Sequence, residues 1–412
     1  MWVWNNITSM RILIVNVNAY TSSTGKITKG LYDYLKGNGH EVKVCYRGTL
    51  EEKVDNEDYI ALEHKWSFYI SVFLSRLTGL EGHFNHLGTL KLFQMIKTFK
   101  PDVVQLYNIH GNYVNSYQLL SFLKKHNIPL VYSMVDEYPY MGRCPFPVDC
   151  EKFKTECNHC PQLNQYPISW FFDTSRKLFN KKKAIYSGFK SIVFTGPPFV
   201  CSHTKEATLM KGQKVLELDE PFSFKEYYYP HDTKKLRKEL GISDEDRVAV
   251  CASGTWPRKG GKFFIDIAKK VRGTQNLRLI FIGYDRTDWE FPDNVIVKGF
   301  ITDQSELADY MSLADVYVCT SVGDTTPSVC LGALGCGTPL IGFDYGGVVD
   351  CAPNEFGTYV PIGDLDAMAK AVMNCRKKTQ TDIENIRAYA VGRFAPEAIY
   401  HKQVEIYQSI IK

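Results

Sequence analysis

Two cations stand where they could hold a phosphate group. The stretch SGTWPRKGGKFF at 253–264 places Arg258 and Lys259 in a loop that follows an apolar run and precedes an expected helix. Backbone amides at a helix N-terminus and two neighbouring cations can together hold a diphosphate. A solvated basic turn would have the same sequence, so this loop alone leaves both interpretations open.

A second turn of the same character lies at 325–329. The amides of Ser328 and Val329 could face an anion, and Asp324 could accept hydrogen bonds from sugar hydroxyls. The alternative is a capping turn, in which Asp324 or Thr326 caps the helix that follows. Two such turns in neighbouring strand-to-helix loops favour a shared diphosphate ligand over two coincidences.

Strands and helices alternate in the segments that must position these loops. An apolar run at 11–17 predicts a strand buried on both faces, followed by a helix from near Gly25 and a strand at 42–46. The unit recurs later in the first half, and a second series starts at 247 after an irregular linker. We expect an α/β fold of two doubly wound parallel-sheet domains facing a cleft, with ligands at the carboxyl ends of the strands.

Composition narrows the class of protein. A formal net charge of +4 over 412 residues is too small to indicate nucleic acid, although it suits phosphorylated ligands or an anionic membrane surface. The first ten residues, MWVWNNITSM, lack the basic start and apolar run of a secretory signal. The apolar stretch at 66–80 is too short and too interrupted to span a bilayer. We therefore expect a cytoplasmic protein.

Five segments, taken in order, carry a family resemblance. They are SSTGKI (22–27), DVVQLYNIHG (102–111), GRCPFPVDCEKFKTECNHCPQLNQYP (142–167), WPRKG (256–260) and DTTPSVCLGALGCGTPLIGFDYGG (324–347). Together they resemble the retaining glycosyltransferases of GT-B family 4, in the branch that makes capsular and colanic acid polysaccharides. The resemblance covers nearly the whole chain and implies a GT-B fold with two Rossmann-like domains.

The resemblance implies roles for particular residues. Arg258 and Lys259 would neutralise the leaving diphosphate, and Asp324 would hold a sugar hydroxyl. The other donor-binding positions that it implies are Gly25, Lys26, Gly254, Ile301, Thr326, Pro327, Ser328, Val329 and Gly332. We expect no catalytic metal, because the Asp-x-Asp sequence at 244–246 precedes a strand and predicts a solvated loop.

Three positions depart from the family pattern. The second acid of the pattern falls on Gly332, and losing that charge-assisted contact costs about 1.5–3 kcal/mol. The usual His-Asp pair is Val135–Asp136, which leaves His110 as the nearest imidazole for catalysis and Asp136 on the acceptor side. A histidine of the pattern is replaced by Arg143. An altered donor, a slow enzyme and an inactive homologue all remain open.

Four cysteines gather within the third segment. Their spacing fits a tetrahedral structural zinc site, and the alternative is a loop of reduced or paired thiols. The four are Cys144, Cys150, Cys157 and Cys160.

These observations define an expected function and domain plan. We expect an acceptor-side domain at 1–215 with the cysteine-rich insert 142–167, a nucleotide-sugar domain at 216–392, and a helix at 393–412 that crosses back to the first domain. The chain would transfer a sugar from a nucleotide diphosphate donor to a lipid-linked surface glycan acceptor, with retention. The aromatic clusters at 66–74 and 225–231 could meet a lipid-linked acceptor at the membrane face, or could instead be helix core and domain-interface packing. The competing class is a degenerate homologue that acts as a non-catalytic partner or glycan-binding subunit.

Overall fold

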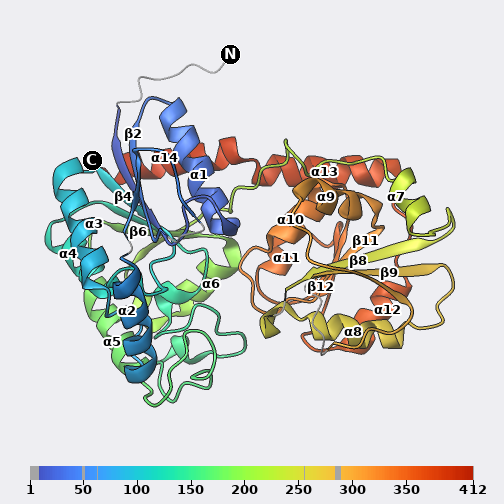
Figure 1. Cartoon of the computed structure of the whole chain (residues 1–412), viewed down its shortest axis with the longest axis horizontal. Coiled ribbons are helices and arrows are strands. Elements are labelled where there is room, and N and C mark those ends of the chain that lie inside the picture. Colours follow the sequence, from blue (N-terminus) through green and yellow to red (C-terminus); the bar gives the residue numbers. More distant parts are fainter. Residues whose placement is uncertain (1–8, 49–51, 63, 255, 284–288, 412) are drawn as a thin grey trace. The chain divides into compact units, whose positions relative to one another are not determined.

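The structure is a computed structural model that describes residues 9–48, 52–62, 64–254, 256–283 and 289–411. The chain divides into two compact units, shown in Figure 1. Unit 1 comprises Met1–Glu220 and Glu397–Lys412, and unit 2 comprises Pro221–Pro396. Each unit is described by itself below.

Unit 1 is built on a parallel sheet in the order β3-β2-β1-β4-β5-β6-β7. Its central strands are nearly all buried, because helices cover both faces of a parallel sheet. The strands are β1 (Arg11–Asn16), β2 (Glu41–Tyr46), β3 (Tyr59–Ala61), β4 (Val103–Leu106), β5 (Leu130–Ser133), β6 (Ile192–Gly196) and β7 (Lys214–Glu217).

Alternate residues of β1 enter two separate cores of unit 1. Ile12 and Ile14 pack with α1 (Ser22–Gly37) and α14 (Pro396–Ile411). Leu13 and Val15 belong to the core on the opposite face, which contains residues of α3 (His86–Phe99), α4 (Ser116–Lys125), α5 (Ser175–Tyr186) and α6 (Pro198–Glu206). The period of two that separates these cores is the side-chain alternation of a strand. The helix α2 (Lys65–Thr78) lies outside this layer, next to α3.

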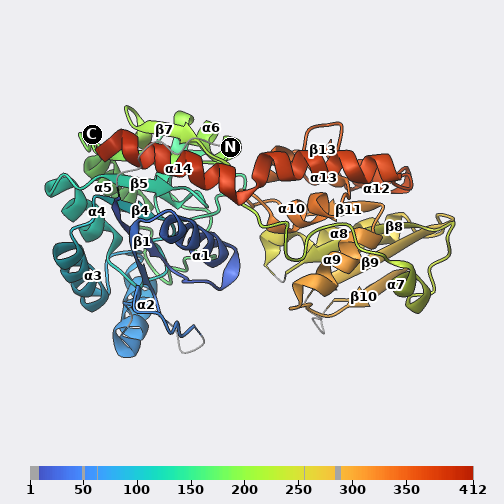
Figure 2. The ribbon, with the colours of Figure 1, turned by 90° about the horizontal axis from the view of Figure 1, so that it is seen from above.

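The last helix of the chain is held in unit 1 by polar contacts as well as apolar ones. Gln403 Nε2 and Tyr407 Oη both donate to Gln105 Oε1 of β4, at 3.0 and 2.9 Å. Tyr400 Oη donates to the carbonyl of Ile27 at 3.3 Å. Figure 2 shows α14 running beside α1 over the sheet. The sequence between 391 and 412 forms two helices and not one, because α13 (Gln380–Phe394) ends before Pro396 begins α14.

Unit 2 contains a second parallel sheet, in the order β10-β9-β8-β11-β12-β13. Its strands are β8 (Arg247–Ser253), β9 (Leu277–Gly283), β10 (Val295–Lys298), β11 (Val316–Cys319), β12 (Leu340–Phe343) and β13 (Gly357–Val360). Its other helices are α7 (Lys234–Glu239), α8 (Gly261–Lys270), α9 (Gln304–Leu313), α10 (Ser328–Gly335), α11 (Gly347–Cys351) and α12 (Leu365–Met373). The prediction of two doubly wound parallel sheets is confirmed.

The Asp-x-Asp stretch at 244–246 is a turn before β8, in which Asp244 and Glu245 are exposed as expected of a solvated loop. The exception is Asp246, which is buried. Its carboxylate accepts from the amide of Ser243 at 2.8 Å and from Arg278 Nε at 3.0 Å, so it closes the turn that leads into β8. Among the described helices, none combines the length and apolar character that a bilayer crossing needs.

Candidate active site

A pocket in unit 2 lies at the carboxyl ends of β8, β9 and β11, which is where open parallel sheets bind ligands. The chain returns to this edge of the sheet through tight loops. Gly260 has a φ of +69°, and a Cβ there would meet the carbonyl oxygen of Thr320 at 1.9 Å. A glycine at this position therefore lets the loop that carries Lys259 lie directly against the end of β11. The pocket is lined by Ala252, Ser253, Gly254, Lys259, Ile282, Gly283, Phe300, Ile301, Leu307, Cys319, Thr320, Ser321, Asp324 and Val329.

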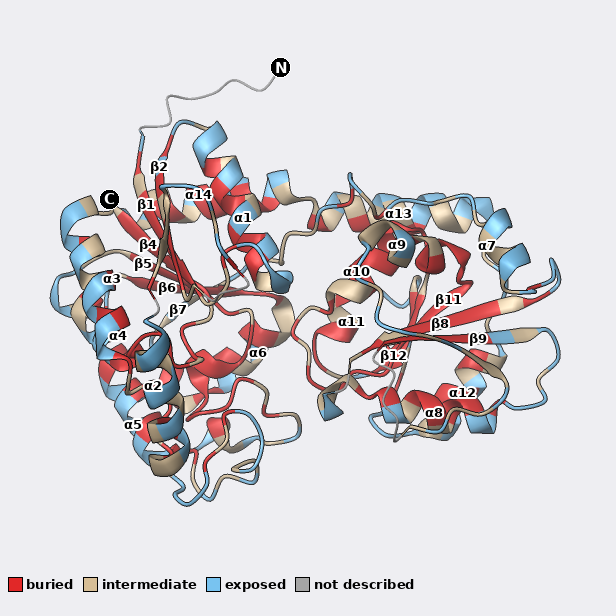
Figure 3. Ribbon diagram, in the orientation of Figure 1, coloured by how far each residue is buried: buried red, intermediate tan, exposed pale blue. Residues whose placement is uncertain are grey.

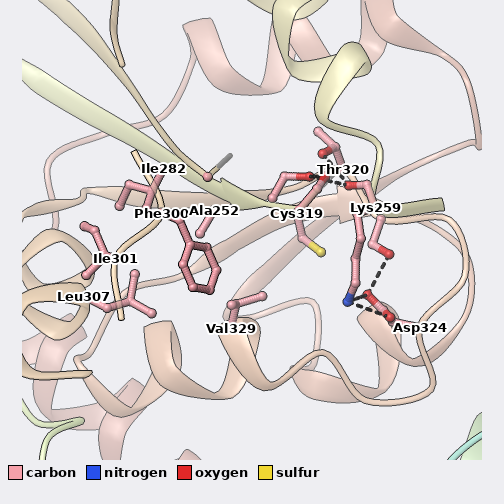
Figure 4. A pocket seen from close by; sticks show the side chains of 14 residues that line it. Ala252, Lys259, Ile282, Phe300, Ile301, Leu307, Cys319, Thr320, Asp324 and Val329 are labelled. Carbon is pink, nitrogen blue, oxygen red and sulfur yellow. Dashed lines mark hydrogen bonds and ion pairs between the residues drawn. The ribbon is translucent and has the colours of Figure 1, made fainter. Parts of the chain in front are cut away.

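The two ends of this pocket differ in polarity, as Figure 4 shows. Lys259 and Asp324 lie at one end with Thr320. Apolar side chains line the other end, where the ring of Phe300 stands between Ile301 and Val329. Phe300 is 60% exposed, so its ring is accessible to a flat ligand. A molecule with an anionic part and a flat, weakly polar part would match both ends.

The charged end is an interlocked cluster. Lys259 Nζ lies 2.9 and 2.8 Å from the two carboxylate oxygens of Asp324, and Arg258 Nη1 also donates to Asp324 Oδ1. Ser321 Oγ donates to Asp324 Oδ2 at 2.7 Å. Burial alone would raise the pKa of Asp324, but the charges of Lys259 and Arg258 lower it to about 2. Asp324 is therefore ionised at neutral pH and is the counterion of both cations.

The structure bears out only some of the predictions made for the turn at 325–329. Pro327 precedes α10, Ser328 begins it, and Val329 lines the pocket. Neither Asp324 nor Thr326 caps this helix through its side chain. The buried hydroxyl of Thr326 makes no hydrogen bond within the described part of the chain. Thr326, Pro327 and Ser328 do not line the pocket, and their predicted contact with a donor stays a prediction.

Gly332 lies in the buried interior of α10, and its surroundings explain the missing acid. A Cβ at this position would meet Tyr228 Cε1 and Cδ1 at 2.7 and 2.9 Å and Met311 Sδ at 3.0 Å. The hydroxyl of Tyr228 donates to Gln304 Oε1 at 2.9 Å, so the ring is fixed at both ends. The tyrosine thus occupies the space into which a side chain at position 332 would grow. Sequence reasoning missed Tyr228 because it precedes α10 by about a hundred residues.

In unit 1 the structure brings His110 and Asp136 together. His110 Nε2 lies 2.7 Å from Asp136 Oδ2, and His110 Nδ1 lies 2.8 Å from the hydroxyl of Tyr166. The amide of Tyr138 donates to Asp136 Oδ1 at 2.9 Å, which fixes the carboxylate. His110 follows β4 and Asp136 follows β5, so the pairing of these two strands brings an imidazole beside Asp136, and the catalytic role of His110 stays a prediction.

The loop before α1 holds an internal anion. The amides of Ala19, Tyr20 and Thr21 all donate to Glu52 Oε1, at 3.0, 2.9 and 2.8 Å. A Cβ at Gly25 would meet the backbone of Tyr20 at 2.8 Å, so this glycine allows α1 to pack closely on that loop. Lys26 is exposed. The predicted contact of Gly25 and Lys26 with a donor stays a prediction.

The four cysteines of the insert are free thiols that lie near one another. Burial raises the pKa of Cys144, and the charges of Cys160, Cys157 and Cys150 raise it further. The amide of Gly142 donates to Cys157 Sγ at 3.3 Å, and Arg143 is buried beside the cluster, donating to the carbonyl of Pro167 at 2.5 Å. Within the described residues, no three His, Cys, Asp or Glu side chains are arranged to hold a metal ion. The predicted zinc site stays a prediction.

Comparison with known proteins supports the family resemblance. Residues 246–377 match the family model described as glycosyl transferases group 1. The chain is 25% identical over 271 residues to the putative colanic acid biosynthesis glycosyl transferase WcaC of Escherichia coli (strain K12). This match covers 64% of each chain, so it spans a little under two thirds of that relative's length.

Solved structures share the fold across almost the whole chain. Sucrose-phosphate synthase from Thermosynechococcus elongatus has a TM-score of 0.69 at 16% identity, with 97% of this chain and 99% of that chain covered. The Anabaena protein Alr3699/HepE in complex with UDP-glucose has a TM-score of 0.63 at 17% identity, with 97% and 100% covered. The resemblance to group 1 glycosyltransferases and the GT-B fold class are confirmed.

Proposed function

We propose that this chain, which contains a group 1 glycosyltransferase domain, transfers a sugar from a nucleoside diphosphate donor to a glycan acceptor. The observation that carries the proposal is the pocket of unit 2, which has Lys259 at one end, joined through Asp324 to Arg258, and an apolar platform at the other. The diphosphate would bind at Lys259 and Arg258, and the base would lie against Phe300 and Ile301. The Anabaena structure contains UDP-glucose, so uridine diphosphate sugars are the first donors to test.

The chemistry follows from where charge develops. When the bond between the anomeric carbon and the phosphate oxygen breaks, negative charge grows on the leaving diphosphate. Lys259 and Arg258 are fixed cations in a partly buried cluster, and such cations stabilise that charge without reorganising. In a retaining reaction the leaving phosphate itself takes the acceptor's proton, so no protein base is required. Asp324 would then hold a hydroxyl of the donor sugar.

The acceptor end of the proposal involves unit 1. His110 and Asp136 form a buried hydrogen-bonded pair, and an acceptor hydroxyl would take the place of the Tyr166 hydroxyl at His110 Nδ1. We propose a surface glycan, carried on a lipid, as the acceptor. A membrane-associated synthesis would place the protein at the cytoplasmic face.

The second candidate function is a degenerate homologue that binds glycan without transferring sugar. The observation that favours it is the packing of Tyr228 over Gly332, which leaves no room for the ribose-binding acid of the family pattern. Both candidates predict a folded unit 2, and they differ in whether nucleotide sugars bind.

Ligand-dependent thermal unfolding separates the two. A donor at a hundred times its dissociation constant stabilises the folded state by about 2.7 kcal/mol. We expect one of the uridine, guanosine or thymidine diphosphate sugars to raise the melting temperature, and Lys259→Ala to remove that shift. Lys262→Ala is the matched control, because Lys262 is an exposed lysine of the same loop-to-helix segment outside the pocket. Failure of every nucleotide sugar to shift the melting temperature would favour the non-catalytic alternative.

A further inference from the structure

The helix α2 has its polar and apolar faces reversed. Its inner positions are Ser67, Ser71 and Ser75, where Ser67 Oγ lies 3.1 Å from Asn85 Oδ1 and Ser75 Oγ donates to Glu81 Oε2 at 3.0 Å. Its outer positions are apolar and exposed: Trp66 by 72%, Tyr69 by 58%, Ile70 by 57% and Phe73 by 53%. A helix of a soluble domain normally places its apolar stripe toward the core, so an exposed stripe of this kind marks a candidate interaction surface.

The apolar surface continues on a loop that follows the cysteine-rich insert. The amide of Trp170 donates to the carbonyl of Arg76 at 2.8 Å, which ties this loop to the end of α2. The rings of Phe73 and Trp170 meet edge to face, with centroids 5.8 Å apart. Trp170, Phe171 and Phe172 are 47%, 70% and 58% exposed. These three residues and the four outer residues of α2 are called the aromatic patch.

The helices around the aromatic patch carry charge of one sign. The helices α2, α3, α4 and α5 contact one another in succession, and Figure 3 shows exposed positions along all four. Their sequences contain eleven Lys and Arg and no Asp or Glu, and all of these cations except the buried Lys182 and the half-buried Lys124 are exposed. The acids near these helices are the buried Glu81, which accepts from Ser75, Asp173, which accepts from the amides of Cys160 and Ser175, and Glu156, which pairs with Arg176. An even mixture of charges would be expected from the chain as a whole, which has 49 basic and 45 acidic residues.

We propose that the aromatic patch and the cations around it bind the surface of an anionic lipid bilayer. Trp and Tyr are the residues that settle at the boundary between headgroups and acyl chains, and Lys and Arg add attraction to anionic headgroups. The charge favours this occupant over a protein partner, because helices whose exposed charged side chains are all basic match a uniformly negative surface. The patch lies on the interface without spanning it, since α2 has only 14 residues.

The patch also borders the proposed acceptor end. Glu81 accepts from Ser75 of α2 through one carboxylate oxygen and from the amide of Gly111, next to His110, through the other at 3.2 Å. If the proposed function holds, binding to the bilayer would bring His110 close to acceptors that are anchored in lipid. The membrane interaction itself does not depend on catalysis, and its failure would leave the donor-binding test unaffected.

Vesicle sedimentation of the full chain tests the proposal. We expect binding to vesicles of phosphatidylcholine with an equal part of phosphatidylglycerol, weaker binding to phosphatidylcholine alone, and release at high salt. The double variant Trp66→Ser and Phe171→Ser should weaken sedimentation with the anionic vesicles by at least about tenfold. The control Ile362→Ser removes an exposed apolar side chain of unit 2 and should leave binding unchanged.

A second readout protects the test against a variant that fails to fold. Brominated phosphatidylcholine, mixed with phosphatidylglycerol, should quench tryptophan fluorescence of the unaltered protein, because Trp66 and Trp170 would enter the interface. Absence of both sedimentation and quenching overturns the proposal. Equal binding of the double variant, with its melting temperature unchanged, also overturns it. Concentration-dependent self-association that the double variant abolishes, without vesicle binding, would identify a protein partner instead.

Discussion

The close packing around Gly332 predicts that replacing this glycine by alanine destabilises the protein, whereas helix propensity alone predicts stabilisation. Gly332→Ala adds one methyl group inside α10. In an open helical position this change stabilises a protein by up to about 1 kcal/mol, because alanine is the better helix former. Here the added carbon would lie 2.7 and 2.9 Å from two ring carbons of Tyr228, which is closer than real Cβ contacts come.

The expected magnitude follows from the neighbours that would have to move. Tyr228 is buried, and its hydroxyl is held by Gln304, so the ring cannot swing away freely. Adding a methyl group to a well-packed core costs about 1–3 kcal/mol. For a unit of this size each kcal/mol lowers the melting temperature by about 2–4 °C.

Chemical denaturation and thermal unfolding of paired variants measure this effect. Gly392→Ala is the matched control, because Gly392 also lies inside a helix, α13, and a Cβ there would have no neighbour within 4 Å. We expect Gly392→Ala to be neutral or stabilising and Gly332→Ala to be destabilising. In a Tyr228→Val background the penalty of Gly332→Ala should shrink, which a double-mutant cycle would report as a coupling energy. A stabilising effect of Gly332→Ala in the unaltered protein would refute the packing argument.

Three further predictions concern other parts of the chain. The pKa of Asp324 is about 2 in the folded protein, which is below its value in an unfolded chain. The contribution of Asp324 to the free energy of unfolding is therefore complete above about pH 4 and is lost as the pH falls toward 2. In urea unfolding across this range, the free energy of unfolding should fall more steeply for the unaltered protein than for Asp324→Asn. Tyr407→Phe should cost about 1 kcal/mol, because Gln105 loses one buried hydrogen bond, and a cost near zero would show that this bond does not help to hold α14. Purified protein should contain one zinc per chain if the cysteine-rich insert binds metal, and Cys144→Ser should then release it; a metal content of zero in protein prepared without chelator would favour reduced thiols.

The parts of the fold that sequence reasoning recovered are those encoded locally. The apolar run at 11–17 predicted β1, and α10 begins at Ser328 as the turn sequence indicated. In each case the signal lies within a few residues of the element that it predicts.

The contacts that could not be predicted from the sequence join residues that are distant along the chain. The pairing of His110 with Asp136 depends on β4 and β5 being neighbours in the sheet. The carboxylate of Glu52 reaches the amides before α1 from about thirty residues away. The apolar run at 66–80 indicated a helix, but nothing in its pattern told which face would be buried, and the serine face is the one that packs. Local patterns predict elements, whereas the partners of polar side chains follow from tertiary structure.

The absence of an acid at position 332 can be explained by loss of function or by an altered mode of binding, and the structure favours one of them. Loss of function by drift would leave a gap where the carboxylate of the family pattern once lay. Instead, the space is filled by an ordered ring, and the hydroxyl of that ring is hydrogen-bonded to Gln304. Meanwhile the cluster of Lys259, Arg258 and Asp324 is intact. Under the proposed function, a charged cluster that stays intact while one position of α10 is repacked favours an altered mode of donor binding over the decay of the whole site.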